Sequence, residues 1–351
     1  MEYKLAILGF GIVGREFARL LQRKSDELAR DYGLTWRVTG LATRRLGMAC
    51  DPAGLDLEAA LSAAQAGQRL EALHSGPPLG DAFDFIARCG ADVLFETTVL
   101  NPQTGQPALD HVRAALNAGM HVITANKGPL AFAYRELLGL ARRQGKAFLF
   151  ESTVMDGAPV FSLARDALLG ANVLGFRGIL NSTTNFILTH MEAGHSFDEA
   201  VRQAQAMGIA EADPSLDVDG WDAATKTAIL ATVLMGAEVT PAQVERVGIR
   251  QVRPEHVQAA RMAGRRIKLV CRAGWQAGRL VARVAPEEVP ADDLLASIHG
   301  TSSALSLYTD TLKQLTIVEH DPGPAQTAYG LLRDLLAIAR QERRATAGQR
   351  V

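Results

Sequence analysis

Residues 3–21 of the chain read Tyr3-Lys4-Leu5-Ala6-Ile7-Leu8, then Gly9-Phe10-Gly11-Ile12-Val13-Gly14, then Arg15-Glu16-Phe17-Ala18-Arg19-Leu20-Leu21. The first part predicts a buried strand and the last part an amphipathic helix. Gly-x-Gly-x-x-Gly between a strand and a helix is typical of a dinucleotide-binding turn, because small residues let the backbone approach a pyrophosphate at the positive end of the helix. We therefore expect all six residues of this turn to bind a dinucleotide. A glycine turn without a ligand is the alternative.

Three later segments also predict strands, at residues 91–96, 121–124 and 147–150, with helical stretches between them. This alternation predicts a doubly wound, parallel Rossmann-type sheet over residues 1–150. Ligands bind beyond the carboxyl ends of such strands. We therefore expect cofactor contacts from Thr97-Thr98 and from Lys127, which follow two of the strands. A purely structural role for Lys127 stays open.

The second strand, predicted at residues 36–42, ends in Thr43-Arg44-Arg45. An NAD-specific fold normally places an acid there to bind the ribose 2′-hydroxyl. Two guanidinium groups suit a 2′-phosphate instead, so Arg44 and Arg45 favour NADP, with NAD still possible. Two arginines that only face solvent are the alternative.

A second, α+β domain is expected over residues 151–320. It begins with a turn-rich connector, and weak strand signals at residues 267–271, 280–284 and 316–319 predict an antiparallel or mixed sheet beneath its helices. The polar hinge Asn181-Ser182-Thr183-Thr184-Asn185 can cap a helix or bind a carboxylate. Residues 321–351 should form a last segment, with a helix over Tyr329–Arg340 that packs back on the first domain.

The segment from Glu211 to Lys226 gathers carboxylates around the start of a predicted helix. Asp222 and Lys226 are four residues apart, so their side chains share one helix face. The sequence that follows, residues 229–234, is apolar, as in a helix that buries its foot. A lysine at such a boundary can carry a proton. An ordinary surface ion pair is the alternative.

Composition narrows the class of protein. The chain has 351 residues, which favours two domains, and its formal net charge of −1 argues against a nucleic-acid partner. No apolar run is long enough to predict a membrane span. The three cysteines and eight histidines show no metal-binding spacing. We therefore expect reduced cysteines and a cytoplasmic protein.

Order and spacing of these motifs over roughly residues 1 to 340 resemble the homoserine dehydrogenase family. The resemblance is carried by Gly9–Gly14, Thr124-Ala125-Asn126-Lys127, Gly178–Asn185, Ala210–Pro214 and Gly220-Trp221-Asp222-Ala223-Ala224-Thr225-Lys226. It implies NAD(P)-dependent interconversion of L-homoserine and L-aspartate 4-semialdehyde, in threonine, methionine and isoleucine biosynthesis. It also implies a homodimer formed through the second domain.

The same resemblance implies roles for single residues. Lys226 would be the proton carrier and Lys127 would help to hold cofactor and substrate. Glu211 and Asp222 would bind the substrate's amino group and orient the lysine. An amino-acid substrate needs anionic partners, for which Asp213 and Asp217 are further candidates, and Thr183 lies in the hinge expected at its carboxylate.

Several positions depart from the family pattern. Ser182 replaces a common glycine and Ile209 a common tyrosine, which keeps open a dehydrogenase for a related amino or hydroxy acid. A glycine-rich family motif is reduced to Asp321-Pro322-Gly323-Pro324, so that Gly323 stays as a cofactor contact. A family sodium site aligns with Glu151, Val154, Asp156 and Ala158.

Two further expectations concern regulation and catalysis. The chain ends near its last predicted helix, so we expect no C-terminal ACT-type domain and no threonine feedback through one. A non-catalytic NADP-binding or assembly protein with this fold is a third hypothesis. The presence of Lys127, Lys226 and both family carboxylates speaks against it.

Overall fold

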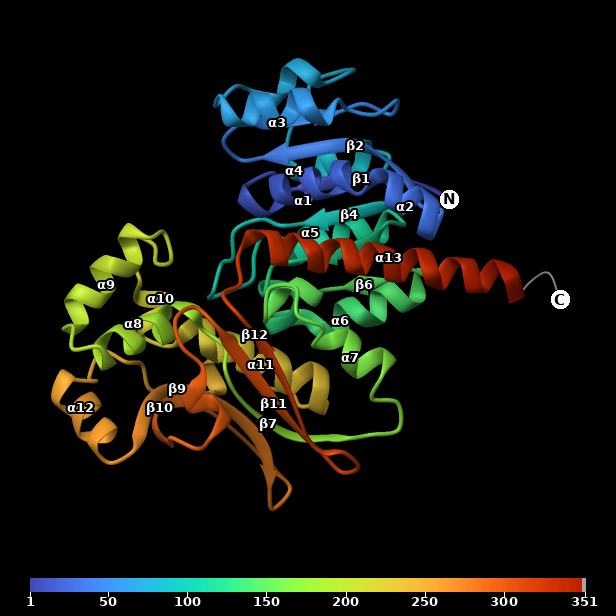
Figure 1. The fold of residues 1–351 in the computed structure, drawn as a ribbon. Coiled ribbons are helices and arrows are strands. Elements are labelled where there is room, and N and C mark those ends of the chain that lie inside the picture. Colours follow the sequence, from blue (N-terminus) through green and yellow to red (C-terminus); the bar gives the residue numbers. More distant parts are fainter. Residues whose placement is uncertain (349–351) are drawn as a thin grey trace. The chain divides into compact units, whose positions relative to one another are not determined.

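The chain divides into two compact units. A computed structural model describes residues 1–348, and its first unit contains Met1–Pro159 together with the segment from Gly323 onward, whereas Val160–Pro322 form the second unit. Residues 349–351 of the last segment expected from the sequence lie outside the described residues. Each unit builds its own sheet (Figure 1).

The sheet of the first unit is parallel apart from one edge strand. Its order is β3-β2-β1-β4-β5-β6, and only β2 and β3 pair in antiparallel fashion. The strands are β1 (Glu2–Leu8), β2 (Thr35–Thr43), β3 (Gly47–Cys50), β4 (Val93–Glu96), β5 (His121–Thr124) and β6 (Phe148–Leu149). The order changes direction between β1 and β4, which is the switch point where such sheets bind ligands. The predicted doubly wound sheet is confirmed, and β3 is an addition that the sequence did not predict.

The helices of the first unit include one from the end of the chain. They are α1 (Ile12–Arg23), α2 (Ser25–Tyr32), α3 (Leu57–Gln65), α4 (Ala82–Arg88), α5 (Ala108–Asn117), α6 (Gly128–Arg143) and α13 (Pro324–Gly348), with 3-10 turns η1 (Leu70–Leu73) and η2 (Glu151–Thr153). Helix α13 is longer than the predicted Tyr329–Arg340. Proline suits a first helical turn because its missing N–H is not needed there. Gln326 Oε1 also accepts a hydrogen bond from Gly323 N at 3.1 Å, which caps the start.

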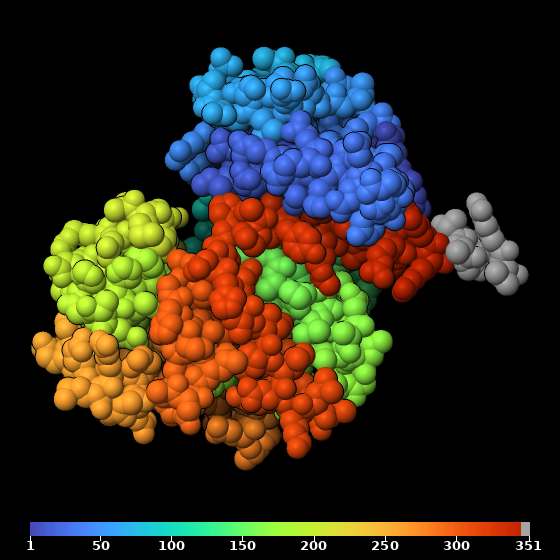
Figure 2. Space-filling view, in the orientation of Figure 1, coloured from blue at the N-terminus to red at the C-terminus, as the bar shows by residue number. Residues whose placement is uncertain are grey.

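One hydrophobic core holds the first unit together. Leu5 and Ile7 of β1, Phe17 of α1, and Leu331 and Leu335 of α13 are all fully buried in it. Helix α13 packs against α1. Figure 2 shows the outer side of α13 at the molecular surface, next to the N-terminal part of the chain. The helix at the end of the chain therefore completes the core that the first strand begins.

The second unit has a mixed sheet with the order β12-β11-β7-β9-β10-β8. All neighbours are antiparallel except β10 and β8. The strands are β7 (Val173–Ile179), β8 (Glu245–Arg246), β9 (Arg265–Gln276), β10 (Arg279–Pro290), β11 (Ser303–Thr309) and β12 (Lys313–Glu319). The expected α+β unit is therefore present. Strands β9 and β10 are much longer than the predicted segments, because they form a hairpin that pairs along the full length of both strands, beyond the apolar runs.

Helices lie against this second sheet. They are α7 (Phe161–Asp166), α8 (Ser182–Glu192), α9 (Phe197–Ala206), α10 (Ser215–Val218), α11 (Trp221–Met235) and α12 (Pro254–Met262), with 3-10 turns η3 (Pro241–Gln243) and η4 (Leu294–Ser297). Helix α11 contacts β7, β9 and β10 and buries Ala224, Ala228 and Ile229 completely. Because α11 is buried in this way, its first turns, which carry Asp222 and Lys226, are held next to the end of β7. Among residues 1–348 no helix has the length and apolar character needed to cross a bilayer.

Candidate active site

The glycine turn after β1 leaves little room for side chains. Gly9 has a φ of +112°, and a Cβ built on it would lie 2.4 Å from the carbonyl carbon of Thr97. A Cβ on Gly14 would lie 2.7 Å from the Gly9 oxygen. At Gly11 the nearest protein atom would be 3.9 Å away, so packing does not demand this glycine. A bound pyrophosphate would require glycine at position 11, because a side chain there would keep the ligand away from the backbone.

The first turn of α1 offers its N–H groups. Gly11 is the N-cap, no side chain caps the helix, and the first turn contains no acidic residue. Phe10 is buried in the core, whereas Ile12 is 64% exposed and Val13 is half-buried. Backbone N–H groups at the positive end of a helix bind phosphate oxygens. The turn therefore has the form of a pyrophosphate site.

Arg44 and Arg45 form the turn between β2 and β3, at the carboxyl end of β2. Both side chains are exposed. Thr43 Oγ1 accepts hydrogen bonds from Arg45 N at 3.1 Å and from Leu46 N at 3.2 Å, which shapes the turn. Within the described part of the chain, no side-chain hydrogen bond or ion pair occupies either guanidinium. Two cations at this strand end are therefore available to an anionic group.

The ends of β4 and β5 are tied together by Asn126, which sequence reasoning did not single out. Its Nδ2 donates to Thr98 O at 3.0 Å, and its Oδ1 accepts from Gly128 N at 2.9 Å. Thr97 Oγ1 donates to Gly9 O at 2.8 Å, so the glycine turn belongs to the same edge. Lys127 is half-buried at the N-cap of α6. The predicted residues of this edge are therefore brought together.

The segment expected to hold sodium is bound to α13 by its side chains. Arg333 Nη1 donates to the buried Glu151 Oε2 at 2.6 Å. Thr327 Oγ1 donates to Asp156 Oδ1 at 2.8 Å. Among the described residues no cluster of three histidine, cysteine or acidic side chains could hold a metal ion. Arg333 neutralises the carboxylate of Glu151, and no chemical step is assigned to a cation here.

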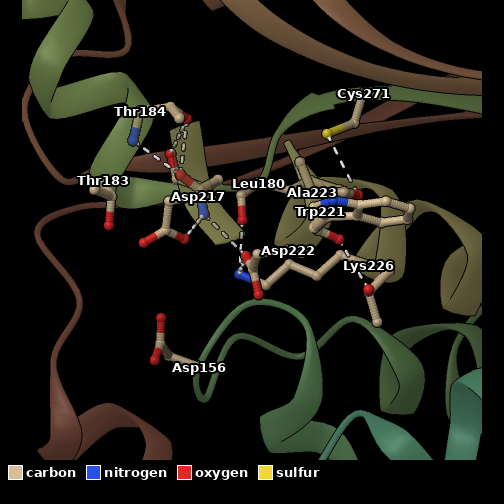
Figure 3. A network of polar contacts seen from close by, with 12 residues as sticks. Asp156, Leu180, Thr183, Thr184, Asp217, Trp221, Asp222, Ala223, Lys226 and Cys271 are labelled. Atoms are coloured by element: carbon tan, nitrogen blue, oxygen red, sulfur yellow. Dashed lines mark hydrogen bonds and ion pairs between the residues drawn. The ribbon is translucent and has the colours of Figure 1, made fainter. Parts of the chain in front are cut away.

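In the second unit, Asn181 joins two carboxylates, Asp217 and Asp222, which Figure 3 shows on the same side as Lys226. Asn181 caps α8, and its Oδ1 accepts from Thr184 N at 2.8 Å. Its Nδ2 donates to Asp217 Oδ1 at 2.6 Å and to Asp222 Oδ2 at 3.0 Å. One buried amide therefore connects α8, α10 and α11. From the sequence we expected the hinge that contains Asn181 to cap a helix or to bind a carboxylate, and the cap is confirmed, but the link to two aspartates was not predicted.

Lys226 lies at the centre of this cluster. Its Nζ donates to Leu180 O at 2.7 Å and lies 3.4 Å from Asp222 Oδ2, as the helical spacing predicts. The side chains of Lys226 and Asp222 are only 15% and 16% exposed. The surface ion pair that the sequence left open is therefore excluded, because both groups are largely withdrawn from solvent.

Asp217 carries an unfavourable negative charge. Burial, and then the neighbouring Asp222 carboxylate, raise the pKa of Asp217, against hydrogen bonds from Asn181 and Thr183 and the charge of Lys226. The Thr183 hydroxyl can instead donate to Ile209 O, at 3.2 Å. A cation bound beside Asp217 would offset this cost. The arrangement suits the ammonium group of a ligand.

Glu211 and Asp213 lie outside this cluster. Both are exposed. Asp213 Oδ1 accepts hydrogen bonds from Ser215 N, at 3.0 Å, and from the Ser215 hydroxyl, which begins α10. In residues 1–348 no hydrogen bond joins the Glu211 carboxylate to Asn181 or Lys226. The structure therefore brings together Thr183, Asp217, Asp222 and Lys226 but not the two earlier acids.

The three cysteines are free and buried. Cys271 Sγ lies 4.0 Å from Ala223 O, behind α11, and burial raises the pKa of its thiol to about 12. Burial also raises the pKa of the Cys50 thiol to about 12. Since the thiolate is the reactive form, neither cysteine supplies a nucleophile.

A pyrophosphate-type turn on a doubly wound sheet, followed by a unit with a lysine held among carboxylates, defines the class of NAD(P)-dependent oxidoreductases. Comparison with known proteins agrees. The family described as homoserine dehydrogenase matches residues 159–336, and its NAD-binding domain matches residues 9–151. The chain is 41% identical over 340 residues to an NAD(+)-dependent homoserine dehydrogenase from Pseudomonas canavaninivorans, with 96% of each chain covered.

Solved structures give the same result. A protein from Archaeoglobus fulgidus described as a homoserine dehydrogenase superposes with a TM-score of 0.86 at 33% identity, covering 96% of this chain and 99% of that one. A hyperthermophilic archaeal homoserine dehydrogenase mutant in complex with NADPH gives a TM-score of 0.82 at 29% identity, covering 97% and 98%. The chain belongs to the homoserine dehydrogenase family, and it is an NAD-binding oxidoreductase that acts on CH–OH groups.

Proposed function

We propose that the chain interconverts L-homoserine and L-aspartate 4-semialdehyde, with Lys226 as the group that moves the proton. The observation that carries the proposal is the half-buried lysine held by Leu180 O and Asp222. Leu180 O and the Asp222 carboxylate fix the position of Nζ, so the amine that exchanges the proton is held in a defined place. The related-acid alternative is not favoured, because the matched relatives share one activity over nearly the whole chain.

The proton and the hydride move in a balanced step. When homoserine is oxidised, hydride leaves C4 and the hydroxyl proton passes to neutral Lys226, which leaves the aldehyde and an ammonium group. In the reverse direction the ammonium returns that proton to the oxygen as hydride reaches the carbonyl carbon. A bound nicotinamide supplies or accepts the hydride. Asp222 stabilises the charged form of the lysine in this cycle.

Asp217 is assigned to the substrate's ammonium group. Asp217 is half-buried, and among the described residues its charge is offset by the amide of Asn181, the Thr183 hydroxyl and Lys226. Glu211 and Asp213, which are exposed, extend the acidic segment at which an ammonium ion arrives. Thr183 is assigned to the substrate's polar end.

Substitution of Lys226 tests the mechanism. Lys226→Ala should lower kcat by a factor of about 10² to 10⁴ and leave NADPH binding unchanged, since the cofactor turn lies in the other unit. Unchanged turnover would remove Lys226 from the mechanism. Asp217→Asn should raise KM for homoserine, whereas Asp219→Asn, a matched change that breaks only an ion pair with Arg250, should not. Equal effects of the two changes would contradict the role of Asp217.

Arg44 and Arg45 support NADP as the preferred cofactor. The supporting observation is a pair of exposed guanidinium groups at the end of β2. Replacement of both by Ser should lower kcat/KM for NADPH by about 10-fold or more and leave that for NADH nearly unchanged, since only NADPH carries the 2′-phosphate. Exposed Arg30, which pairs with Asp31, is the control position. Preference of the unchanged enzyme for NADH would overturn this assignment, and the 41%-identical relative is described as NAD(+)-dependent.

Three expectations complete the proposal. The reaction would serve threonine, methionine and isoleucine biosynthesis in the cytoplasm, where free cysteines stay reduced. The chain would form a homodimer through its second unit, which light scattering of the purified protein tests. A sodium ion held by the carbonyls of residues 151–158 would make activity differ between sodium and choline salts at equal ionic strength.

A further inference from the structure

A completely buried carboxylate, Glu96, ends strand β4 and has no part in the proton transfer described above. It lies in register with Leu8 of β1 and Thr124 of β5, at the switch point of the sheet. A fully buried acid is rare unless hydrogen bonds satisfy it. Its partners therefore indicate what it does.

The side-chain partners of Glu96 lie at the cofactor edge, in the loop after β4 and at the end of β5. Its Oε1 accepts from Thr98 N at 3.1 Å and from the Thr98 hydroxyl. Its Oε2 accepts from Thr124 Oγ1 at 3.0 Å. Thr124 Oγ1 in turn accepts from Asn126 N at 2.9 Å. The carboxylate thus fixes both the 97–98 loop and the start of the 126–128 loop.

The contacts continue from these loops to the expected cofactor residues. Asn126 Nδ2 donates to Thr98 O at 3.0 Å, which closes a ring of hydrogen bonds through Glu96. Lys127 follows directly, at the N-cap of α6. Thr97 Oγ1 reaches the glycine turn through Gly9 O at 2.8 Å. The carboxylate therefore supports the ends of β4 and β5 directly, and Thr97 ties the glycine turn to the same edge.

We propose that Glu96 is a positioning residue for cofactor binding, and that its ionised form is the one that holds the loops at β4 and β5 in the binding arrangement. Hydrogen bonds to an ionised acceptor are roughly twice as strong as those to a neutral one. A protonated Glu96 can still accept from Thr98 and donate to Thr124, so the ring persists but loosens. This inference concerns the cofactor unit alone and does not depend on Lys226.

The surroundings of Glu96 bring its protonation change close to neutral pH. Burial raises the pKa of Glu96 to about 7, against the hydrogen bonds from Thr98 and Thr124. Within the described chain no charged group contributes to this pKa. On α5, which packs on β4, Asp110 pairs with Arg113, and the pKa of His111 responds to Asp110 and Asp81 rather than to Glu96. On the neighbouring strands, Lys4 of β1 and His121 of β5 lie at the ends opposite Glu96. The loops should therefore tighten as pH rises through neutrality.

Glu96→Gln is the decisive variant, because an amide reproduces the hydrogen bonds of the protonated acid. NADPH dissociation constants are measured by fluorescence titration from pH 5.5 to 9. We expect wild type to bind about threefold to tenfold more tightly than Glu96→Gln at pH 8.5, and the ratio to fall toward one near pH 5.5. The ratio cancels the titration of the cofactor itself. A ratio of one at all pH values would overturn the proposal.

The thermal stability of Glu96→Gln is a second measurement, and it distinguishes a positioning role from a purely structural one. Because the folded-state pKa lies above the ordinary value of 4.5, ionisation of Glu96 costs stability as pH rises from 4.5 to 7. Glu96→Gln should therefore match or exceed the Tm of wild type at pH 8.5 while binding NADPH more weakly. A lower Tm at every pH, with unchanged affinity, would show a structural role only.

Two further variants complete the test. Asp92→Asn is the matched control, because Asp92 accepts from Lys4 N at 2.8 Å at the opposite end of the same strand. It should keep the pH profile of wild type. Thr98→Ala removes one hydrogen bond to the ionised form, so the pH midpoint of binding should move upward. An unmoved midpoint would contradict the proposal even if Glu96→Gln does not fold.

Discussion

The first unit builds its binding edge mainly from backbone, whereas the second unit builds its site from charged side chains. In the first unit, Gly9 and Gly11 bring main chain to the surface, and a buried acid, Glu96, lies behind the loops. In the second unit, the proposed site consists of side chains, with Lys226 beside Asp222 and an amide between Asp222 and Asp217. A backbone site depends on shape, and a side-chain site depends on protonation.

The two sites should therefore fail in different ways. An added methyl group should destroy the first, since its atoms are within van der Waals contact across the turn. The second should tolerate small changes in volume but respond to the loss of one polar group, because buried charges need their partners.

The largest effect is expected at Gly9. Gly9→Ala places a Cβ 2.4 Å from Thr97 and forces a φ of +112° on alanine. We expect a loss of stability of about 3 kcal/mol or more and no measurable NADPH binding. Gly11→Ala is the matched control, because its Cβ meets no protein atom within 3.9 Å. It should keep the wild-type Tm in calorimetry and still lose affinity. A lowered Tm for Gly11→Ala would contradict the conclusion that Gly11 is needed for the approach of the ligand and not for packing.

A smaller effect is expected at Asn181. Asn181→Ala leaves Asp217 and Asp222 without their shared donor, at a cost of roughly 1 to 3 kcal/mol. If that cost falls on the transition state, kcat drops by about 5-fold to 150-fold. Ser196→Ala removes a helix cap of the same kind on α9, away from the carboxylates. Steady-state kinetics should show no change for Ser196→Ala. An equal drop in both variants would mean that capping, not charge, explains Asn181.

A third effect, which develops only above about pH 8, concerns the pH dependence of stability. Lys268 of β9 is fully buried, and its Nζ donates to Ile298 O at 2.6 Å and to Asn185 Oδ1 at 3.3 Å. Burial lowers the pKa of Lys268 to about 8, against the charge of Glu192 and together with that of Arg266. Between this value and the ordinary 10.5, the unfolded chain binds a proton that the folded chain does not. Stability should therefore rise with pH in this window, by on the order of 3 kcal/mol at most.

Lys268→Met should lack this rise, and thermal unfolding from pH 7 to 10.5 measures it. The sign is opposite to that expected for Glu96, whose titration costs stability between pH 4.5 and 7. Lys24→Met, at a surface ion pair with Glu27, should behave as wild type. If Lys268→Met and wild type have parallel curves, the buried lysine does not titrate in the folded state.

Much of the fold could be predicted from residues that are close together in the sequence. The glycine turn was evident because its requirements are met by consecutive residues: small atoms, a preceding strand and a following helix. The pairing of Asp222 with Lys226 was evident for a similar reason, since four residues make one helical turn. Strand β3 and the full length of α13 were not predicted. The first is only four residues long, and the second draws its stability from the core that it shares with Leu5 and Phe17.

The roles of Asn181 and Glu96 could not be read in this way. Each acts through partners distant in sequence: Asn181 meets Asp217 and Asp222, and Glu96 meets Thr124. The sequence by itself determined the dinucleotide turn and the helix face of Lys226, because these depend on residues within a few turns of one another. It also determined the family, because the motifs keep their order and spacing along the chain. Only the tertiary structure decided which carboxylates are buried and which amide or hydroxyl satisfies them, because desolvation depends on everything that packs around a group.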